Sequence, residues 1–164
     1  MKEVRAKVYK IFLSHSSYDR LWVDRIANGA KNNGIEVYLY EHDPQPGTAI
    51  ADKIERNIRG SDALVVLLTQ NSRYSPYVQQ EIGFAKASGK QVIPLVQSGV
   101  GRESLAMLEG TEYIPFDLYN PEEAVSKLLS YVRKLKQNKE GALGIVILGL
   151  VGLLFLAGLS GEEK

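Results

Sequence analysis

The run ALVVLL, at residues 63–68, is the feature that most limits how this chain can fold. Six apolar residues in a row are typical of a strand in a parallel sheet, because helices cover both faces of such a sheet. The segment 48–59, which precedes the run, places Ile50, Ile54 and Ile58 four residues apart, as on one side of a helix. The run is therefore predicted to be a central strand of an α/β sheet.

Strand-like and helix-like segments alternate along the rest of the chain. We predict strands at 8–13, 35–40, 63–68, 91–97 and 111–116, and helices at 19–33, 48–59, 76–88 and from Asn120 onward. Pro94 is an awkward residue for the fourth strand, since proline donates no hydrogen bond to a sheet. The alternation predicts a flavodoxin-like, doubly wound sheet of five parallel strands in the order 2-1-3-4-5.

A long apolar segment follows near the C-terminus. Residues 141–159 form 19 positions without a charge, which is long enough to cross a bilayer core. Lysines precede the segment, so we expect that side to be cytoplasmic and the protein to be a single-pass membrane protein. The alternative is a buried helix or an oligomer-packing tail. The predicted organisation is a domain at 1–135, a polar link at 136–140, a transmembrane helix at 141–159 and a short tail at 160–164.

Composition and missing motifs remove several classes of function. A net charge of +1 gives no basic field for nucleic acid, so no nucleic-acid partner is expected. The chain has no cysteine and only two histidines, so we expect no metal site. Neither GxGxxG after the first strand nor GxxxxGK[ST] occurs, which excludes the usual phosphate cradles.

Ligands of such sheets bind at the carboxyl edge of the strands. Ser14, His15 and Ser16 follow the first predicted strand and can offer hydrogen bonds to a polar ligand, while Ser17 or Asp19 is expected to cap the next helix. The loop 41–47, EHDPQPG, follows the second strand, and its prolines and glycine indicate a shaped loop. It is either a functional loop or a connector.

Glu81 lies in the apolar stripe of the helix predicted at 76–88, one turn from Tyr77 and from Phe84. Burying an unpaired carboxylate costs several kcal/mol unless it is protonated or hydrogen-bonded. One explanation is a structural partner, such as a backbone amide or Arg73. The other is an active-site acid at the mouth of a cleft, with a pKa altered by its surroundings.

Several segments together resemble Toll/interleukin-1 receptor (TIR) domains of the prokaryotic type, over roughly residues 7–135. YKIFLSHS, at 9–16, resembles the first box of that family, and DPQPG, at 43–47, resembles its BB loop. SPYVQQE, at 75–81, resembles its Ser-x-Trp-x-x-x-Glu motif, with Tyr77 in place of the tryptophan. His15 and Ser16 stand where some members carry arginines.

The resemblance implies an enzyme that consumes NAD⁺ as a substrate and needs no cofactor. Glu81 matches the catalytic glutamate of the family, and the expected reaction cleaves the nicotinamide–ribose bond in cell-death, antiphage or immune-type signalling. The implied substrate-binding residues are Ser14, His15, Ser16, Asp43 and Tyr77. Other TIR domains are the implied protein partners, through an interaction loop of Asp43, Pro44, Pro46 and Gly47, and the lipid bilayer is contacted through 141–159.

Two other functions fit the same residues. Many animal TIR domains are non-catalytic adaptors that signal through homotypic contacts. A nucleoside deoxyribosyltransferase shares the flavodoxin-like fold, and its glutamate also attacks an N-glycosidic bond. Loss of NAD⁺ distinguishes the NAD⁺-consuming enzyme from the adaptor. Exchange of bases on deoxynucleosides identifies the deoxyribosyltransferase.

Overall fold

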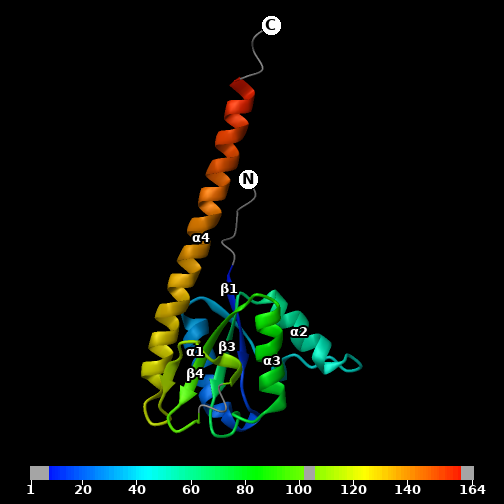
Figure 1. Ribbon diagram of the computed structural model, residues 1–164, viewed down its shortest axis with the longest axis vertical. Coiled ribbons are helices and arrows are strands. Elements are labelled where there is room, and N and C mark those ends of the chain that lie inside the picture. Colours follow the sequence, from blue (N-terminus) through cyan, green and yellow to red (C-terminus); the bar gives the residue numbers. More distant parts are fainter. Residues whose placement is uncertain (1–7, 102–105, 160–164) are drawn as a thin grey trace. The chain divides into compact units, whose positions relative to one another are not determined.

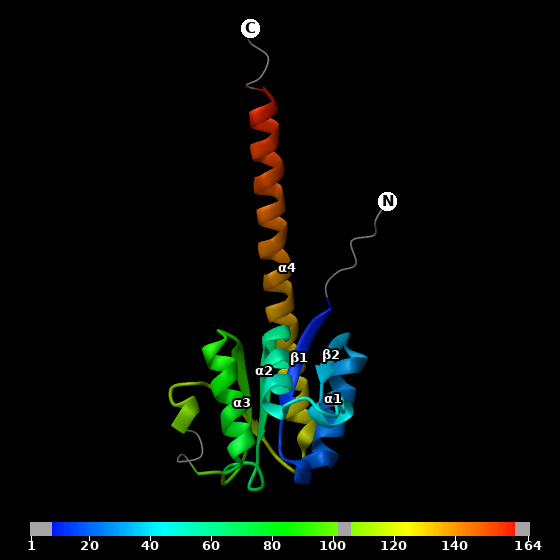
Figure 2. The same ribbon diagram turned by 90° about the vertical axis from the view of Figure 1, so that its right-hand side faces the viewer.

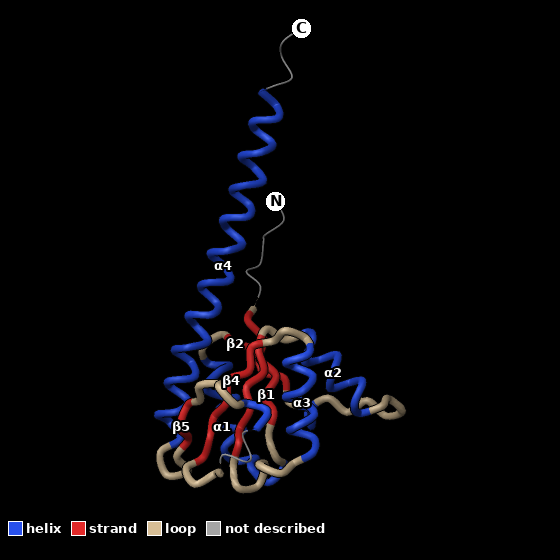
Figure 3. Tube along the Cα trace, viewed as in Figure 1, coloured by secondary structure: helices blue, strands red, loops and turns tan. Residues whose placement is uncertain are grey.

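The computed structural model describes residues 8–101 and 106–159, and it describes side chains as far as Lys139. The chain divides into two compact units, residues 1–129 and 130–164. The first unit holds a sheet of five parallel strands in the order β2-β1-β3-β4-β5, as the sequence predicts (Figures 1 and 3). The strands are β1 Tyr9–Ser14, β2 Ile35–Tyr38, β3 Ala63–Leu68, β4 Gln91–Gln97 and β5 Ile114–Phe116.

Helices cover both faces of this sheet (Figure 2). They are α1 Arg20–Asn32, α2 Ile50–Gly60, α3 Pro76–Ala87 and the first part of α4 Pro121–Leu159, as far as residue 129. Two short 3-10 turns, η1 Ser17–Asp19 and η2 Tyr40–His42, follow β1 and β2. Helices α2 and α3 pack on one face, where Ile54 and Ile82 join a core with Leu64 of β3. Every residue of β3 is buried, which explains its unbroken apolar sequence.

Two strands are shorter than the sequence predicts. β2 ends at Tyr38 and not at residue 40, because the chain turns into η2. β5 begins at Ile114 and not at residue 111, because Thr111 is held in a turn by a hydrogen bond from its amide to the Leu108 carbonyl. Pro94 does lie in β4, opposite Val66 of β3. It is tolerated since β4 pairs with β5 only from Leu95 onward.

The second unit consists of the remainder of α4 and the C-terminal residues. Residues 136–140, the predicted polar link, are helical. Within the fully described part of the chain, no helix combines the length and the apolar character that a membrane span requires. The span predicted at 141–159 falls on residues whose side chains are outside that part, and the tail at 160–164 lies outside the described residues.

Candidate active site

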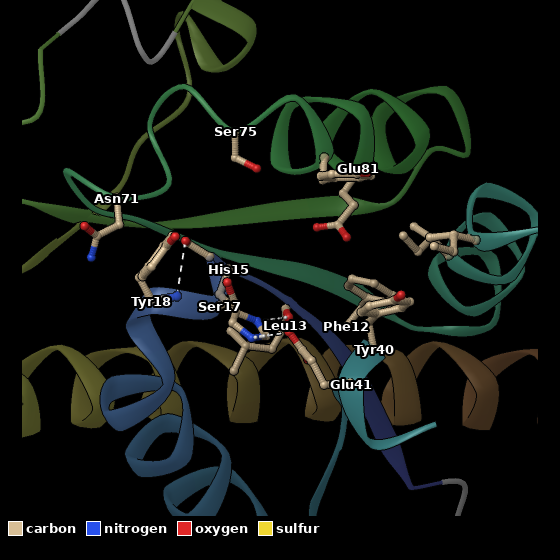
Figure 4. Close-up of a pocket in the computed structure, with 14 residues that line it drawn as sticks. Phe12, Leu13, His15, Ser17, Tyr18, Tyr40, Glu41, Asn71, Ser75 and Glu81 are labelled. Carbon is tan, nitrogen blue, oxygen red and sulfur yellow. Dashed lines mark hydrogen bonds and ion pairs between the residues drawn. The ribbon is translucent and has the colours of Figure 1, made fainter. Parts of the chain in front are cut away.

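Glu81 is positioned by the way α3 begins. The Ser75 hydroxyl accepts a hydrogen bond from the Val78 amide, and Pro76 occupies the first turn, so the helix starts at a fixed residue. Six residues further on, Glu81 lies among the buried residues of the helix, and only 7% of it is exposed. Its carboxylate points toward the end of β1 (Figure 4).

The partner of Glu81 is Ser14, the last residue of β1. The Ser14 hydroxyl donates a hydrogen bond to Oε2 of Glu81, and both groups are buried. Neither of the structural partners considered from sequence is the observed one. Arg73 instead places its guanidinium over the ring of Tyr74, 4.5 Å from the ring centroid. Among the described residues, one neutral donor therefore fixes Glu81, and no lysine or arginine forms an ion pair with it.

Burial raises the pKa of Glu81 to about 7. The Ser14 hydrogen bond and the nearby charge of His15 act in the opposite direction, while the charge of Glu41 adds to the increase. A carboxyl group with a pKa near neutral pH exists in both protonation states under ordinary conditions. Groups of this kind are concentrated in active sites.

A second charged pair lies next to Glu81. Nε2 of His15 is 3.0 Å from Oε1 of Glu41, and Nδ1 of His15 is 2.9 Å from the Leu13 carbonyl oxygen. Burial lowers the pKa of His15, but the two hydrogen bonds and the charges of Glu41 and Glu81 outweigh this effect and raise it overall. The hydrogen bond from His15 holds the pKa of Glu41 below its usual value.

These groups line one cavity at the carboxyl edge of the sheet (Figure 4). Its volume is about 450 Å³, which is within the range of small-molecule sites. The lining combines apolar and aromatic side chains with a few polar ones: Phe12, Leu13, His15, Ser16, Ser17, Tyr18, Tyr40, Glu41, Ile50, Ile54, Asn71, Ser75, Tyr77 and Glu81.

The structure brings most of the sequence-predicted site residues to this cavity. His15, Ser16, Tyr77 and Glu81 line it, and Ser14 contacts it through Glu81. Tyr77 is 62% exposed, so its ring stands at the cavity's opening and not in the core.

Asp43, predicted as a substrate-binding residue, is not among the lining residues. Its carboxylate accepts hydrogen bonds from the Tyr38 hydroxyl at 2.9 Å and from the Gln45 amide at 2.7 Å. These contacts stabilise the loop that was compared with the BB loop. Within that loop Gly47 has a φ of +82°, a conformation that favours glycine.

Other lining residues were not singled out from the sequence, notably Tyr18, Tyr40, Glu41 and Asn71. Glu41 and Asn71 follow the second and third strands, so the carboxyl-edge rule alone could have identified them. Tyr18 lies in the loop after the first strand, at the same edge of the sheet. Tyr40 carried no such signal, because the sequence pattern placed it at the end of the strand predicted at 35–40.

The expected helix cap after β1 is wrong at Asp19. This residue occupies the N-cap position of α1 without a side-chain capping bond. Its buried carboxylate accepts hydrogen bonds from the Thr69 hydroxyl at 2.7 Å and from the Asn71 amide at 2.8 Å. The hydroxyl of Ser16, and not that of Ser17, accepts a hydrogen bond from the Tyr18 amide. Asp19 therefore links the loops after β1 and β3 and fixes the cavity wall that Asn71 forms.

Among the residues whose side chains the structure describes, no group of three histidines and carboxylates is close enough to hold a metal ion.

Comparisons with known proteins agree on the fold. No curated protein sequence matches the chain. Among solved structures, the TIR domains of the activated Roq1 resistosome, which directly recognises the pathogen effector XopQ, align with a TM-score of 0.62 and 17% identity over 76% of this chain and 99% of theirs. The TIR domain of the Toll-related receptor TRR-2 from Hydra magnipapillata aligns with a TM-score of 0.60 and 18% identity, over 79% of this chain and 97% of that one.

A nucleotide-cleaving enzyme shares the fold as well. The CMP N-glycosidase BcmB of Clostridium botulinum aligns with a TM-score of 0.53 and 18% identity, over 73% of this chain and 97% of that one. The family itself is identified by sequence, because the model of the TIR domain family matches residues 11–129. The chain belongs to the TIR domain family.

Proposed function

We propose that the protein is an NAD⁺ glycohydrolase or cyclase that cleaves the nicotinamide–ribose bond. The observation that carries the proposal is the buried carboxylate of Glu81, which lines a cavity of about 450 Å³ and has a pKa of about 7. The TIR resemblance assigns the catalytic role to this residue. A structural role alone gives no reason for a titratable carboxylate to line a cavity of this size.

The reaction suits a site with one such carboxylate. In NAD⁺ the nicotinamide nitrogen carries a positive charge, so nicotinamide leaves as a neutral molecule and needs no acid to protonate it. The bond from C1′ of the ribose to that nitrogen breaks, and the electron pair goes to the nitrogen. Ionised Glu81 stabilises the oxocarbenium-like centre that develops at C1′. Water then adds at C1′ and releases a proton, or a group of the same molecule adds there to give a cyclic product.

Few charged side chains are present in the cavity to bind the phosphates of NAD⁺. Among the described residues that line the cavity, none is a lysine or an arginine, and the ring nitrogens of His15 already face the Leu13 carbonyl and Glu41. The hydroxyls of Ser16 and Ser17 and the amide of Asn71 supply neutral donors. We propose that these donors bind the phosphates and that the ring of Tyr77, at the opening, stacks on a flat base.

The second candidate is an N-glycosidase that acts on another nucleotide. The similarity to the CMP N-glycosidase BcmB favours it, since that enzyme has the same fold. The bond type is shared by both candidates, so Glu81 has the same role in each. They differ in the base that is released.

We further propose that the TIR domains self-associate and that the segment 141–159 anchors the protein in a membrane. The apolar sequence of that segment supports the anchor, and the preceding lysines favour a cytoplasmic TIR domain. Clustering on a surface would raise the effective concentration of the domains. The solved resistosome with TIR domains supports assembly as a property of this fold.

One experiment separates the candidates. The full-length chain in liposomes is incubated with NAD⁺, and in parallel with CMP, and the released bases are identified by chromatography. Release of nicotinamide without release of cytosine supports the NAD⁺ enzyme, and the reverse supports the second candidate. Release of neither, from domains shown to be clustered, overturns both and leaves the adaptor function.

A further inference from the structure

A second carboxylate, that of Glu41, lines the same cavity as Glu81, and the reaction proposed above gives it no role. Glu41 lies in η2, at the carboxyl end of β2, and Figure 4 shows it across the cavity from Glu81. The side chain of Glu41 is 37% exposed, so a ligand in the cavity can contact it.

The carboxylate of Glu41 is held in a fixed direction by His15. Only 6% of the His15 side chain is exposed, and its two ring nitrogens face the Leu13 carbonyl at 2.9 Å and Glu41 at 3.0 Å. A ring with an acceptor at each nitrogen is best satisfied when both nitrogens carry a proton. The charged ring of His15 therefore fixes the position of the Glu41 carboxylate and stabilises its negative charge.

The turn that carries Glu41 is held from a different direction. Lys53, on α2, is 4% exposed, and its ammonium donates hydrogen bonds to the carbonyls of Tyr40 and Asp43, on either side of Glu41. The same ammonium lies 4.4 Å from the ring centroid of Tyr40. Backbone and side chain of Glu41 are thus both fixed before a ligand arrives, which reduces the entropic cost of binding.

The two carboxylates of the cavity differ in chemical character. The His15 hydrogen bond lowers the pKa of Glu41, whereas burial raises that of Glu81 to about 7. A carboxylate that stays ionised is a weak base but a good hydrogen-bond acceptor. It offers about four acceptor positions, and His15 and the backbone amide of Glu41 itself occupy two of them. The remaining capacity matches two hydroxyl donors.

The geometry points to Glu41 as a specificity-determining residue that accepts hydrogen bonds from the vicinal hydroxyls of the ribose bearing the leaving base. A carboxylate is a suitable acceptor for ribose hydroxyls. The site thereby selects ribonucleotides over 2′-deoxyribonucleotides, because loss of a hydroxyl leaves a desolvated carboxylate without its donor. This inference rests on the proposed cleavage at Glu81 and names the class of sugar that the same site accepts.

The test compares two substrates in two proteins. Initial rates of nicotinamide release are measured for NAD⁺ and for its analogue without the 2′-hydroxyl on the nicotinamide ribose, with the full chain in liposomes. We expect Glu41→Gln to lower kcat/KM for NAD⁺ about tenfold, mainly through KM, and to change that for the analogue less than threefold. For each substrate, kcat/KM of the variant is divided by that of the parent. This ratio cancels the greater intrinsic reactivity of deoxyribosides, because that reactivity affects both proteins equally. An equal loss for both substrates would mean that Glu41 only maintains the structure, and would overturn the inference.

The matched control is Glu36→Gln. Glu36 lies on the preceding strand β2 and forms an ion pair with Lys10 at 3.2 Å, away from the cavity. Thermal unfolding shows whether each variant is folded.

A binding measurement keeps the inference independent of turnover. ADP-ribose, with and without the 2-hydroxyl of its terminal ribose, is titrated into the full chain in detergent. Preference for the hydroxyl in the parent, lost in Glu41→Gln, supports the inference even if NAD⁺ is not cleaved. Equal affinities in the parent, or no binding of either, overturn it.

Discussion

The hydroxyl of Ser14 donates a hydrogen bond to the carboxylate of Glu81 and joins the end of β1 to the middle of α3. The two residues are 67 positions apart in the chain. This contact places a carboxyl group with a pKa of about 7 at the carboxyl edge of the sheet, where the cavity opens. The position of the Glu81 carboxylate follows from the Ser14 hydrogen bond, and its raised pKa follows from burial.

The first prediction concerns stability. The pKa of Glu81 is higher in the folded than in the unfolded protein, so its contribution to stability is fully present below about pH 4.5 and is lost as pH rises through about 7. Glu81→Gln keeps the shape and cannot ionise. We expect it to stabilise the protein by roughly 2–3 kcal/mol at pH 8.5 and by little at pH 4.5. Thermal unfolding of the full chain in detergent measures this difference. A variant less stable than the parent at pH 8.5 would show that the charged carboxylate is stabilising.

The second prediction concerns pH and Ser14. The proposed mechanism requires ionised Glu81, so nicotinamide release should rise with pH through about 7. Ser14→Ala removes a hydrogen bond that lowers the pKa of Glu81, and should shift the midpoint upward by about one unit. The rate against pH is measured for parent and variant. A rate that falls over this range would contradict the mechanism.

Ser61→Ala is the control for this shift. Ser61 is also buried, but its hydroxyl donates to the Asn57 carbonyl at 2.8 Å, away from the cavity. It should cost stability without moving the midpoint.

The third prediction concerns Lys53. Replacing it by methionine removes the hydrogen bonds to the Tyr40 and Asp43 carbonyls and leaves two carbonyls without this donor. We expect a loss of about 2–3 kcal/mol of stability and a KM for NAD⁺ raised about tenfold, because Tyr40 and Glu41 are no longer held at the cavity. Thermal unfolding and kinetics on one preparation give both values. Lys31→Met, an exposed lysine of α1, should change neither. An unchanged KM in the Lys53 variant would mean that this contact does not shape the site.

The five strands could be predicted from the sequence, because apolar runs and helical spacing are local properties. Their order followed from the doubly wound fold that the alternation of strands and helices indicates. The end of β2 could not, since η2 depends on a lysine from α2. The position of Asp43 was missed for a similar reason. The resemblance implied that Asp43 binds substrate, but its carboxylate accepts hydrogen bonds from Tyr38 and Gln45, which stabilise the loop.

The role of Asp19 shows the same limit. An acidic residue before a helix is usually a cap, yet Asp19 bonds Thr69 and Asn71, which are 50 and 52 residues away. Glu41 was considered only as part of the loop 41–47, because its contact with His15 arises only when β1 and β2 lie side by side. Long-range side-chain pairs are what the sequence pattern leaves out.

The fourth prediction concerns the segment 141–159. If it anchors the protein, the full chain should float with liposomes on a density gradient. Arginines at two central positions, Leu148→Arg with Leu150→Arg, should abolish flotation, since each costs about 2.5–3.5 kcal/mol at the centre of a membrane helix. The matched control is Leu148→Ile with Leu150→Ile. Flotation of the arginine variant, or none of the parent, would contradict the anchor.

The measurement that tests the central proposal most directly is NAD⁺ loss by the full-length chain in liposomes at pH 8, beside Glu81→Gln and the control Glu36→Gln. Activity in the parent and in Glu36→Gln, with a loss of at least 100-fold in Glu81→Gln, is the predicted result. Rates equal to background in all three proteins, with the TIR domains shown to be clustered, would contradict the enzymatic function and leave Glu81 as a structural residue.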